Sequence, residues 1–155
     1  MKKLLQIALL TTSLQAEGFY KTLSLGVGTA ELQTNSSTTY NLTYEVGTIF
    51  ENGVKTSLAF IGEYANIDES NINSYGFDAH LGYSFFERVD LYAIGSLLQQ
   101  SSFGVIGYGT GYGAGTTLKL TKNLATALEY KTYTITKPTY EYDYATTILK
   151  LKWLF

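Results

Sequence analysis

The feature that most constrains this chain is a strict alternation of apolar and polar residues, repeated in segment after segment. In residues 39–50 one set of alternate positions is apolar and the other is polar or small: Tyr40, Leu42, Tyr44, Val46 and Phe50 against Asn41, Thr43, Glu45 and Gly47. A period of two is typical of a β-strand whose faces meet different surroundings. Fourteen Tyr, eight Phe and a single Pro also favour strands.

Eight segments alternate in this way, and each is about as long as the 9–11 residues that a tilted membrane strand needs. They cover residues 20–32, 39–50, 54–65, 74–85, 90–99, 110–120, 124–135 and 143–155. The fifth segment has two possible phases, because Leu91, Ala93 and Leu97 compete with Tyr92, Ile94 and Leu98 for the apolar face.

The connections between segments predict how the strands join. Residues 51–53, the stretch around 87–88 and residues 121–123 are tight turns, and Asn52-Gly53 is a strong hairpin signal. The intervening connections are expected to be longer loops, near residues 33–38, 66–73, 100–109 and 136–142. Short turns at one end and longer loops at the other indicate an all-β fold, an eight-stranded antiparallel up-and-down transmembrane β-barrel over residues 17–155.

The first 16 residues have the composition of a secretory leader. Lys2 and Lys3 precede the apolar run Leu4–Leu10, and Ala16 is a small residue at the expected cleavage site. Cleavage would change the formal charge from −2 to −4, since nine basic residues would remain against thirteen acidic ones (9 − 13 = −4). No nucleic-acid partner is indicated, and the absence of cysteine excludes disulfides and thiolate chemistry.

The composition of the second face indicates which side of the barrel is outside. A soluble lipocalin-like barrel turns its large apolar side chains inward and its charges outward. Here the second face is rich in Gly, Ala, Ser and Thr and poor in charge, which suits the lumen of a narrow eight-stranded barrel. We therefore expect the apolar face to meet lipid.

Charges on the second face have both signs, and enclosed charges need partners. A lumen network that plugs the barrel is predicted from Glu45, Lys55, Glu63, Asp78, His80, Lys119, Glu129, Lys131 and Lys150, with Lys152 on the same face. Glu45, Glu63 and Glu129 are expected to pair with some of the lysines.

Aromatic residues are sorted toward the two ends of the strands, as the interfacial girdles of a membrane barrel require. The end that holds both termini would carry Phe19, Phe50, Phe85, Trp153 and Phe155. The opposite end would carry Tyr40, Tyr64, Tyr75, Tyr112 and Tyr142.

In this pattern the chain resembles the OmpA/OmpX-type family of eight-stranded outer-membrane barrels, most specifically in its last strand, residues 149–155. The resemblance implies that Leu151, Trp153 and Phe155 form the signal read by the outer-membrane assembly machinery. It also implies a monomer in the cell outer membrane of a Gram-negative bacterium, with outer-membrane lipid and lipopolysaccharide as surroundings. A structural or cell-surface role is expected; a lipid-modifying barrel enzyme, a narrow channel and a soluble periplasmic ligand-binding barrel are the alternatives.

Three features could indicate a catalytic or ligand-binding site, but each has a simpler explanation. His80 is expected to be a lumen histidine, because the position two residues later, where eight-stranded lipid A deacylases have serine, is Gly82. The glycines of residues 107–115 follow a spacing of two, which indicates a strand and not a phosphate loop. Residues 68–71 and the Glu141/Asp143 pair are expected to be solvated acidic groups. No catalytic, cofactor or metal site is predicted.

Overall fold

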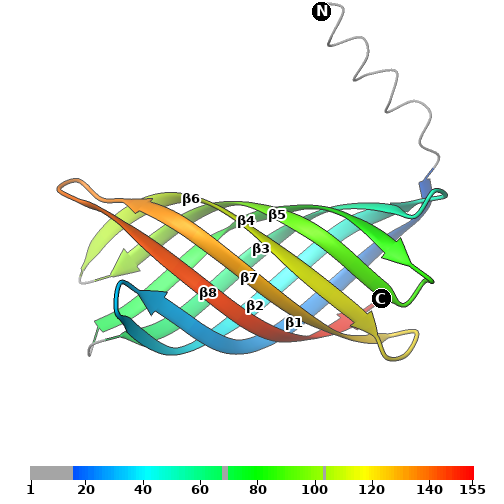
Figure 1. Cartoon of the computed structure of the whole chain (residues 1–155), viewed down its shortest axis with the longest axis horizontal. Helices are drawn as coiled ribbons and strands as arrows, with labels where there is room; N and C mark the ends of the chain where they lie inside the picture. Colours follow the sequence, from blue (N-terminus) through cyan, green and yellow to red (C-terminus); the bar gives the residue numbers. More distant parts are fainter. Residues whose placement is uncertain (1–15, 68–69, 103) are drawn as a thin grey trace, which may run out of the picture.

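The computed structural model describes residues 16–67, 70–102 and 104–155, which form a closed barrel of antiparallel strands (Figure 1). Each strand pairs with the next along the chain, and the last pairs with the first. The strands are β1 Ala16–Leu32, β2 Asn35–Phe50, β3 Val54–Ile67, β4 Ser70–Phe85, β5 Val89–Ser102, β6 Val105–Lys119, β7 Leu124–Thr136 and β8 Glu141–Leu154. The predicted fold class is confirmed.

The strands are staggered, so that a row of paired residues climbs as it passes around the barrel. A row that starts at Lys21 returns to β1 at Glu31, a stagger of ten residues (31 − 21 = 10). Its members are Lys21, Val46, Leu58, Ala79, Gly95, Tyr112, Thr132, Ala145 and Glu31. Such a stagger tilts the strands, and eight tilted strands enclose an interior that side chains can fill.

Short connections join consecutive strands at both ends of the barrel. We call the end where β1 begins and β8 ends the near end, and the opposite end the far end (Figure 1). The near-end turns span residues 51–53, 86–88 and 120–123, close to the predicted positions. The longer loops predicted at the far end are wrong: for example, only residues 33–34 separate β1 from β2.

Most residues assigned to those loops continue the strands instead. Ser36, Ser37 and Thr38 pair with Glu31, Ala30 and Thr29. These segments are polar because one of their faces meets water, and not because they leave the sheet.

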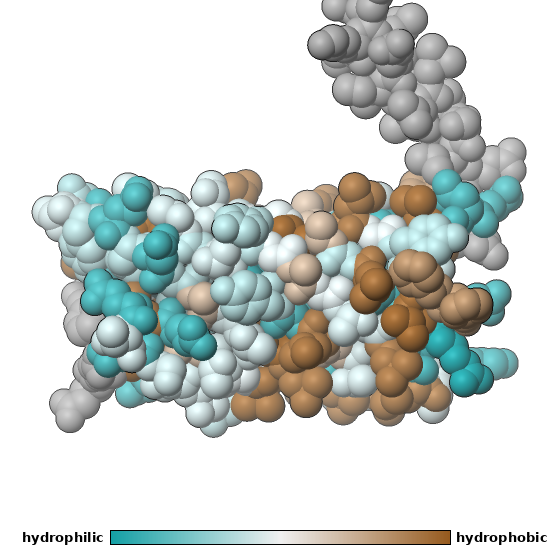
Figure 2. Space-filling model, in the orientation of Figure 1, coloured by the Kyte–Doolittle hydropathy of each residue, from teal (hydrophilic) through white to brown (hydrophobic). Residues whose placement is uncertain are grey.

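The outer wall carries the apolar face, as predicted. Leu81 is 61% exposed and Leu97 is 63% exposed, whereas Ile94 and Leu98 are buried. This fixes the phase of β5, with Leu91, Ala93 and Leu97 outward. Figure 2 shows apolar side chains gathered over the half of the wall toward the near end, and paler, polar ones toward the far end.

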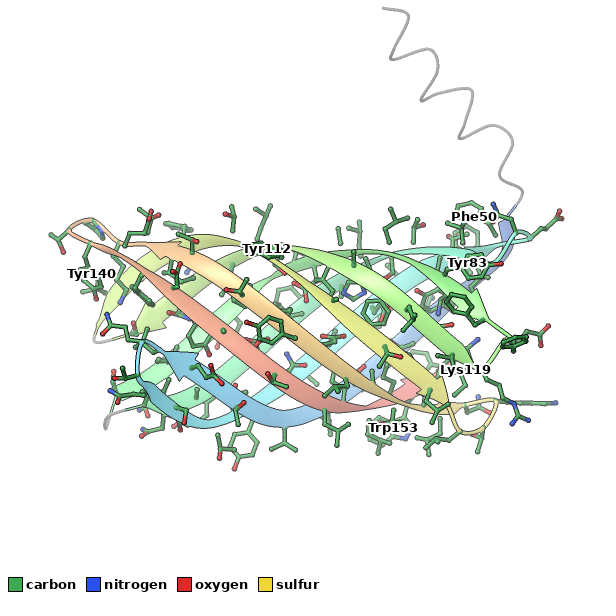
Figure 3. All side chains as sticks on the ribbon, viewed as in Figure 1. Phe50, Tyr83, Tyr112, Lys119, Tyr140 and Trp153 are labelled. Carbon is green, nitrogen blue, oxygen red and sulfur yellow. The ribbon has the colours of Figure 1, made fainter. Side chains whose placement is uncertain are left out.

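The aromatic residues occupy both borders of this apolar band. Phe50, Tyr83 and Trp153 lie near one end of the ribbon, and Tyr112 projects outward farther along the barrel (Figure 3). Tyr40, Tyr64 and Tyr75 are also exposed on the outer wall. Tyr142 is not part of the girdle, contrary to the prediction, because it shares the inward phase of Lys150 and Lys152 and is buried.

Within the described residues, no helix is long and apolar enough to cross a membrane. Residues 1–15 of the predicted leader lie outside the described residues. Ala16, predicted as its last residue, is the first residue of β1.

Candidate functional site in the barrel lumen

Lys131 lies at the centre of the lumen and contacts two carboxylates. Its Nζ is 2.9 Å from Glu63 Oε1 and 3.1 Å from Asp78 Oδ2, and its side chain is fully buried. Asp78 also accepts a hydrogen bond of 2.6 Å from Ser96. Strands β3, β4 and β7 thus meet at one amine, which joins opposite walls of the barrel.

A second buried pair lies beside the first. Lys150 Nζ is 2.5 Å from Glu129 Oε2. The same amine donates to Thr43 Oγ1 at 3.1 Å, and the hydroxyl of Tyr92 donates to Glu129 at 3.0 Å. The pair therefore connects β7 and β8 to β2 and β5.

Closer to the near end, the carboxylate of Glu45 accepts several hydrogen bonds. Lys152 Nζ lies 2.7 Å from its Oε2, while Ser57 and Tyr20 donate to its Oε1 at 2.7 and 3.0 Å. The sequence placed Lys152 on this face, among the charges expected to be enclosed.

Lys55 and Lys119 lie at the near-end mouth and differ in their partners. Lys55 forms an ion pair with Asp90, a residue that the sequence analysis missed because the phase of β5 was open. Within the described residues, Lys119 makes no ion pair, although it was predicted to belong to the network. It lines an open cavity of about 810 Å³ at the mouth, together with Glu51 and Glu87. Figure 3 shows Lys119 at this end of the barrel.

His80 lies inside the barrel, but its contacts are not those of a catalytic relay. Its Nδ1 is 3.0 Å from Ser57 Oγ and 3.5 Å from Glu45 Oε1, while its Nε2 has no hydrogen-bond partner. A serine–histidine–acid relay needs the serine on one ring nitrogen and the acid on the other. Here both lie on the same nitrogen, and all three side chains are buried away from lipid.

Above the ion pairs, toward the far end, the interior contains a cluster of buried apolar side chains. The buried cluster comprises Ala30, Ala59, Ile61, Ala65, Ile67, Ile72, Leu98, Tyr133, Ile135, Tyr142 and Tyr144. At the same level the outer wall is polar, with Asn66, Asn71 and Thr136 exposed. The polarity of the two faces therefore changes along the barrel. Toward the near end the wall is apolar outside and charged inside, whereas toward the far end the outer wall is polar and the interior holds the apolar cluster beside buried Lys137, Gln100 and Ser102.

Sequence reasoning missed this change, although the signal was present. Ile67 and Ile72 occur in a stretch assigned to a loop, and Ile135 alternates with Thr134 and Thr136. The apolar residue lies on the inward phase in each case.

Glycines in β6 make room for large inward side chains. A Cβ atom on Gly111 would lie 2.4 Å from Tyr133 Cδ1, and one on Gly115 would lie 2.5 Å from Tyr92 Cε2. Both distances are far below normal contact. The alternating glycines of residues 107–115 thus lie in a strand, and the missing side chains accommodate Tyr133 and Tyr92.

The acidic groups at the far end lie on the outer wall. Glu141 and Asp143 each accept a hydrogen bond from a β7 threonine, Thr136 at 3.1 Å and Thr134 at 3.2 Å. Residues 68–69 of the other predicted acidic stretch lie outside the described residues. In the part of the chain that the structure describes, no group of three His, Cys, Asp or Glu residues is placed to hold a metal ion.

The three residues of the predicted assembly signal face outward at the near end. Leu151 and Trp153 are each 40% exposed, and Phe155 is 67% exposed. The backbone N–H of Phe155 donates to Lys21 O at 3.1 Å, so the last residue is attached to β1.

Comparisons with solved structures find the same architecture. Neisserial surface protein A is similar, with a TM-score of 0.59 at 17% identity over 90% of this chain and 97% of that one. Ail, the attachment invasion locus protein of Yersinia pestis, has a TM-score of 0.60 at 18% identity over 90% and 99%. The outer membrane enzyme PagL has a TM-score of 0.56 at 12% identity over 84% and 97%.

At these identities the likeness establishes the fold, which is that of eight-stranded outer-membrane barrels. No protein-family model matches the chain, and no curated protein matches it.

Proposed function

We propose that this protein is an integral barrel of the bacterial outer membrane that acts structurally or at the cell surface, without catalysis and without an open pore. Two observations support the location. The outer wall carries an apolar band bordered by aromatic residues, and the fold is shared with outer-membrane barrels. The predicted leader would direct the chain to the envelope.

The observation that carries the non-porous role is the position of Lys131 between Glu63 and Asp78. Charges enclosed in a narrow lumen are stable only when they are paired, and separating such a pair costs several kcal/mol. The apolar cluster beyond the ion pairs adds a second barrier, because ions would have to pass among buried side chains such as Tyr133, Tyr144 and Ile135.

A catalytic role, as in the similar barrel PagL, finds no support in the contacts of the single histidine. Ser84 and Glu63 lie on the same inward face as His80 but do not hydrogen-bond to it within the described residues. Ser84 lines the near-end mouth, and Glu63 pairs with Lys131.

Single-channel recording tests the proposed closed lumen. We expect the purified barrel in planar bilayers to give no stable conductance steps under conditions in which a general porin does. Replacing Tyr133 and Tyr144 together with alanine should produce conductance if the apolar cluster is the main barrier. Large, long-lived steps from the unmodified protein would show an open channel and overturn the proposal.

A further inference from the structure

A groove crosses the outer wall in the half of the barrel toward the far end. Its volume is about 690 Å³, and its lining comes from strands β3 to β8. The residues that matter most for its chemistry are Phe77, Leu97, Tyr108, Thr134, Thr136 and Glu141.

The groove changes from apolar to polar along its length. The paired row Gln99, Tyr108, Thr136 and Glu141 climbs toward the far rim, because each row rises as it passes around the staggered barrel. Phe77 and Leu97 lie at the lower end, 60% and 63% exposed and continuous with the apolar band. The groove therefore extends from the lipid-facing band to the polar rim, as a site for one amphipathic molecule would.

The charges at the polar end restrict the head of that molecule. Glu141 lines this end, and the exposed Asp143 is paired with the lining residue Thr134. The exposed basic residues of the described chain, Lys21, Arg88 and Lys122, all lie toward the near end. Lys137, next to Thr136, is buried and its Nζ donates to Ser102, so a bare phosphate would meet carboxylates without an exposed cation, which is unfavourable.

Hydroxyl groups suit this end better. A hydroxyl that donates to a carboxylate forms a stronger hydrogen bond than a neutral pair does. Thr134 and Thr136 add hydroxyls of their own, and the ring of Tyr108, 66% exposed, offers an apolar face with a polar tip.

We propose that this groove binds a glycolipid whose head is a neutral saccharide. The acyl chain lies against Phe77 and Leu97, and the saccharide packs on Tyr108 and donates hydroxyl hydrogen bonds to Glu141. This inference concerns the outer wall and does not depend on whether the lumen conducts.

Native mass spectrometry of the full barrel released from nanodiscs tests the site. The discs contain a neutral glycosyl diacylglycerol and phosphatidylglycerol with the same acyl chains, in the presence of a chelator of divalent cations. Thr134→Trp fills the groove. Thr29→Trp is the matched control, because Thr29 is an exposed threonine on β1 outside the groove.

We expect the unmodified barrel and Thr29→Trp to retain the glycolipid in preference to phosphatidylglycerol, and Thr134→Trp to lose that preference. Glu141→Ala should weaken retention of the glycolipid roughly tenfold through loss of a hydrogen bond to a charged group. If Thr134→Trp fails to fold, the retention of glycolipid by Glu141→Ala tests the site instead.

Three results would overturn the proposal. One is equal retention of both lipids by the unmodified barrel. Another is a preference that neither Thr134→Trp nor Glu141→Ala changes. The third is retention of phosphatidylglycerol alone once calcium replaces the chelator, which would indicate a cation bridge to phosphate.

Discussion

Lys150 Nζ lies 2.5 Å from Glu129 Oε2, and each of the two side chains is only 1% exposed. Both side chains are shielded from bulk solvent, so either charge without the other would be left in a medium of low polarity. Substitutions in this pair should therefore show how much the buried charges of the lumen contribute to the stability of the barrel.

Glu129→Ala should lower the free energy of unfolding by about 3–5 kcal/mol, because Lys150 then remains buried without its partner. Urea unfolding in lipid vesicles would measure this, with the exposed Asp143→Ala as control and an expected change within about 1 kcal/mol. A double variant with methionine at both positions 129 and 150 should be less destabilised than Glu129→Ala. Equal effects of Glu129→Ala and Asp143→Ala would mean that the lumen is hydrated.

Ile135→Ala tests the apolar cluster at the far end. Ile135 is fully buried, and removing its side chain should cost about 2–5 kcal/mol, as in a soluble core. Ile106→Ala is the matched control, because Ile106 is 50% exposed on the outer wall. If the two variants unfold at the same urea concentration, the cluster does not contribute to stability.

Gly76→Ala tests the close approach of β4 and β5. The added Cβ would lie 2.2 Å from the backbone oxygen of Leu97, whereas a Cβ on Gly95 would meet nothing within 4 Å. Gly76→Ala should therefore cost about 1–3 kcal/mol or more, and Gly95→Ala should change stability by less than about 1 kcal/mol. The heat-induced shift in gel mobility would compare them, and a larger effect at Gly95 would contradict this packing.

Deleting Phe155 tests the predicted assembly signal. The residue is 67% exposed and attached to the rest of the barrel through its backbone, so little packing is lost. The amount of folded protein in outer membranes should fall strongly, while refolding of the purified chain in detergent should change little. Equal losses in both assays would show that Phe155 acts through stability alone.

The alternation of residues was sufficient to predict much of the fold. It predicted the number of strands, their order and the outward phase of Tyr40, Tyr75 and Leu149. A period of two allows only two choices of face for each strand, so a few apolar residues determine the phase of all the others. In β5 both faces carry apolar residues, and the prediction was ambiguous there for that reason.

The extent of the strands at the far end was predicted poorly, because the polar residues there were interpreted as loops. Segments such as residues 35–38 are polar on the wall that meets water, and they still continue the ladder. Tyr142 was assigned to the outer girdle by its height alone, although its phase turns it inward.

The sequence by itself determined that alternate residues face lipid and that charges of both signs lie on the other side. It did not determine which charges meet, because residues such as Lys131 and Glu63 are 68 positions apart. Only the closure of the barrel, with its stagger of ten residues, brings them to the same height on opposite walls. The change from a charged interior to one with an apolar cluster is already visible in single strands, since Lys131 and Ile135 share the inward phase of β7. Which of these side chains become neighbours across the lumen is set by the stagger of all eight strands together, and no single strand contains that information.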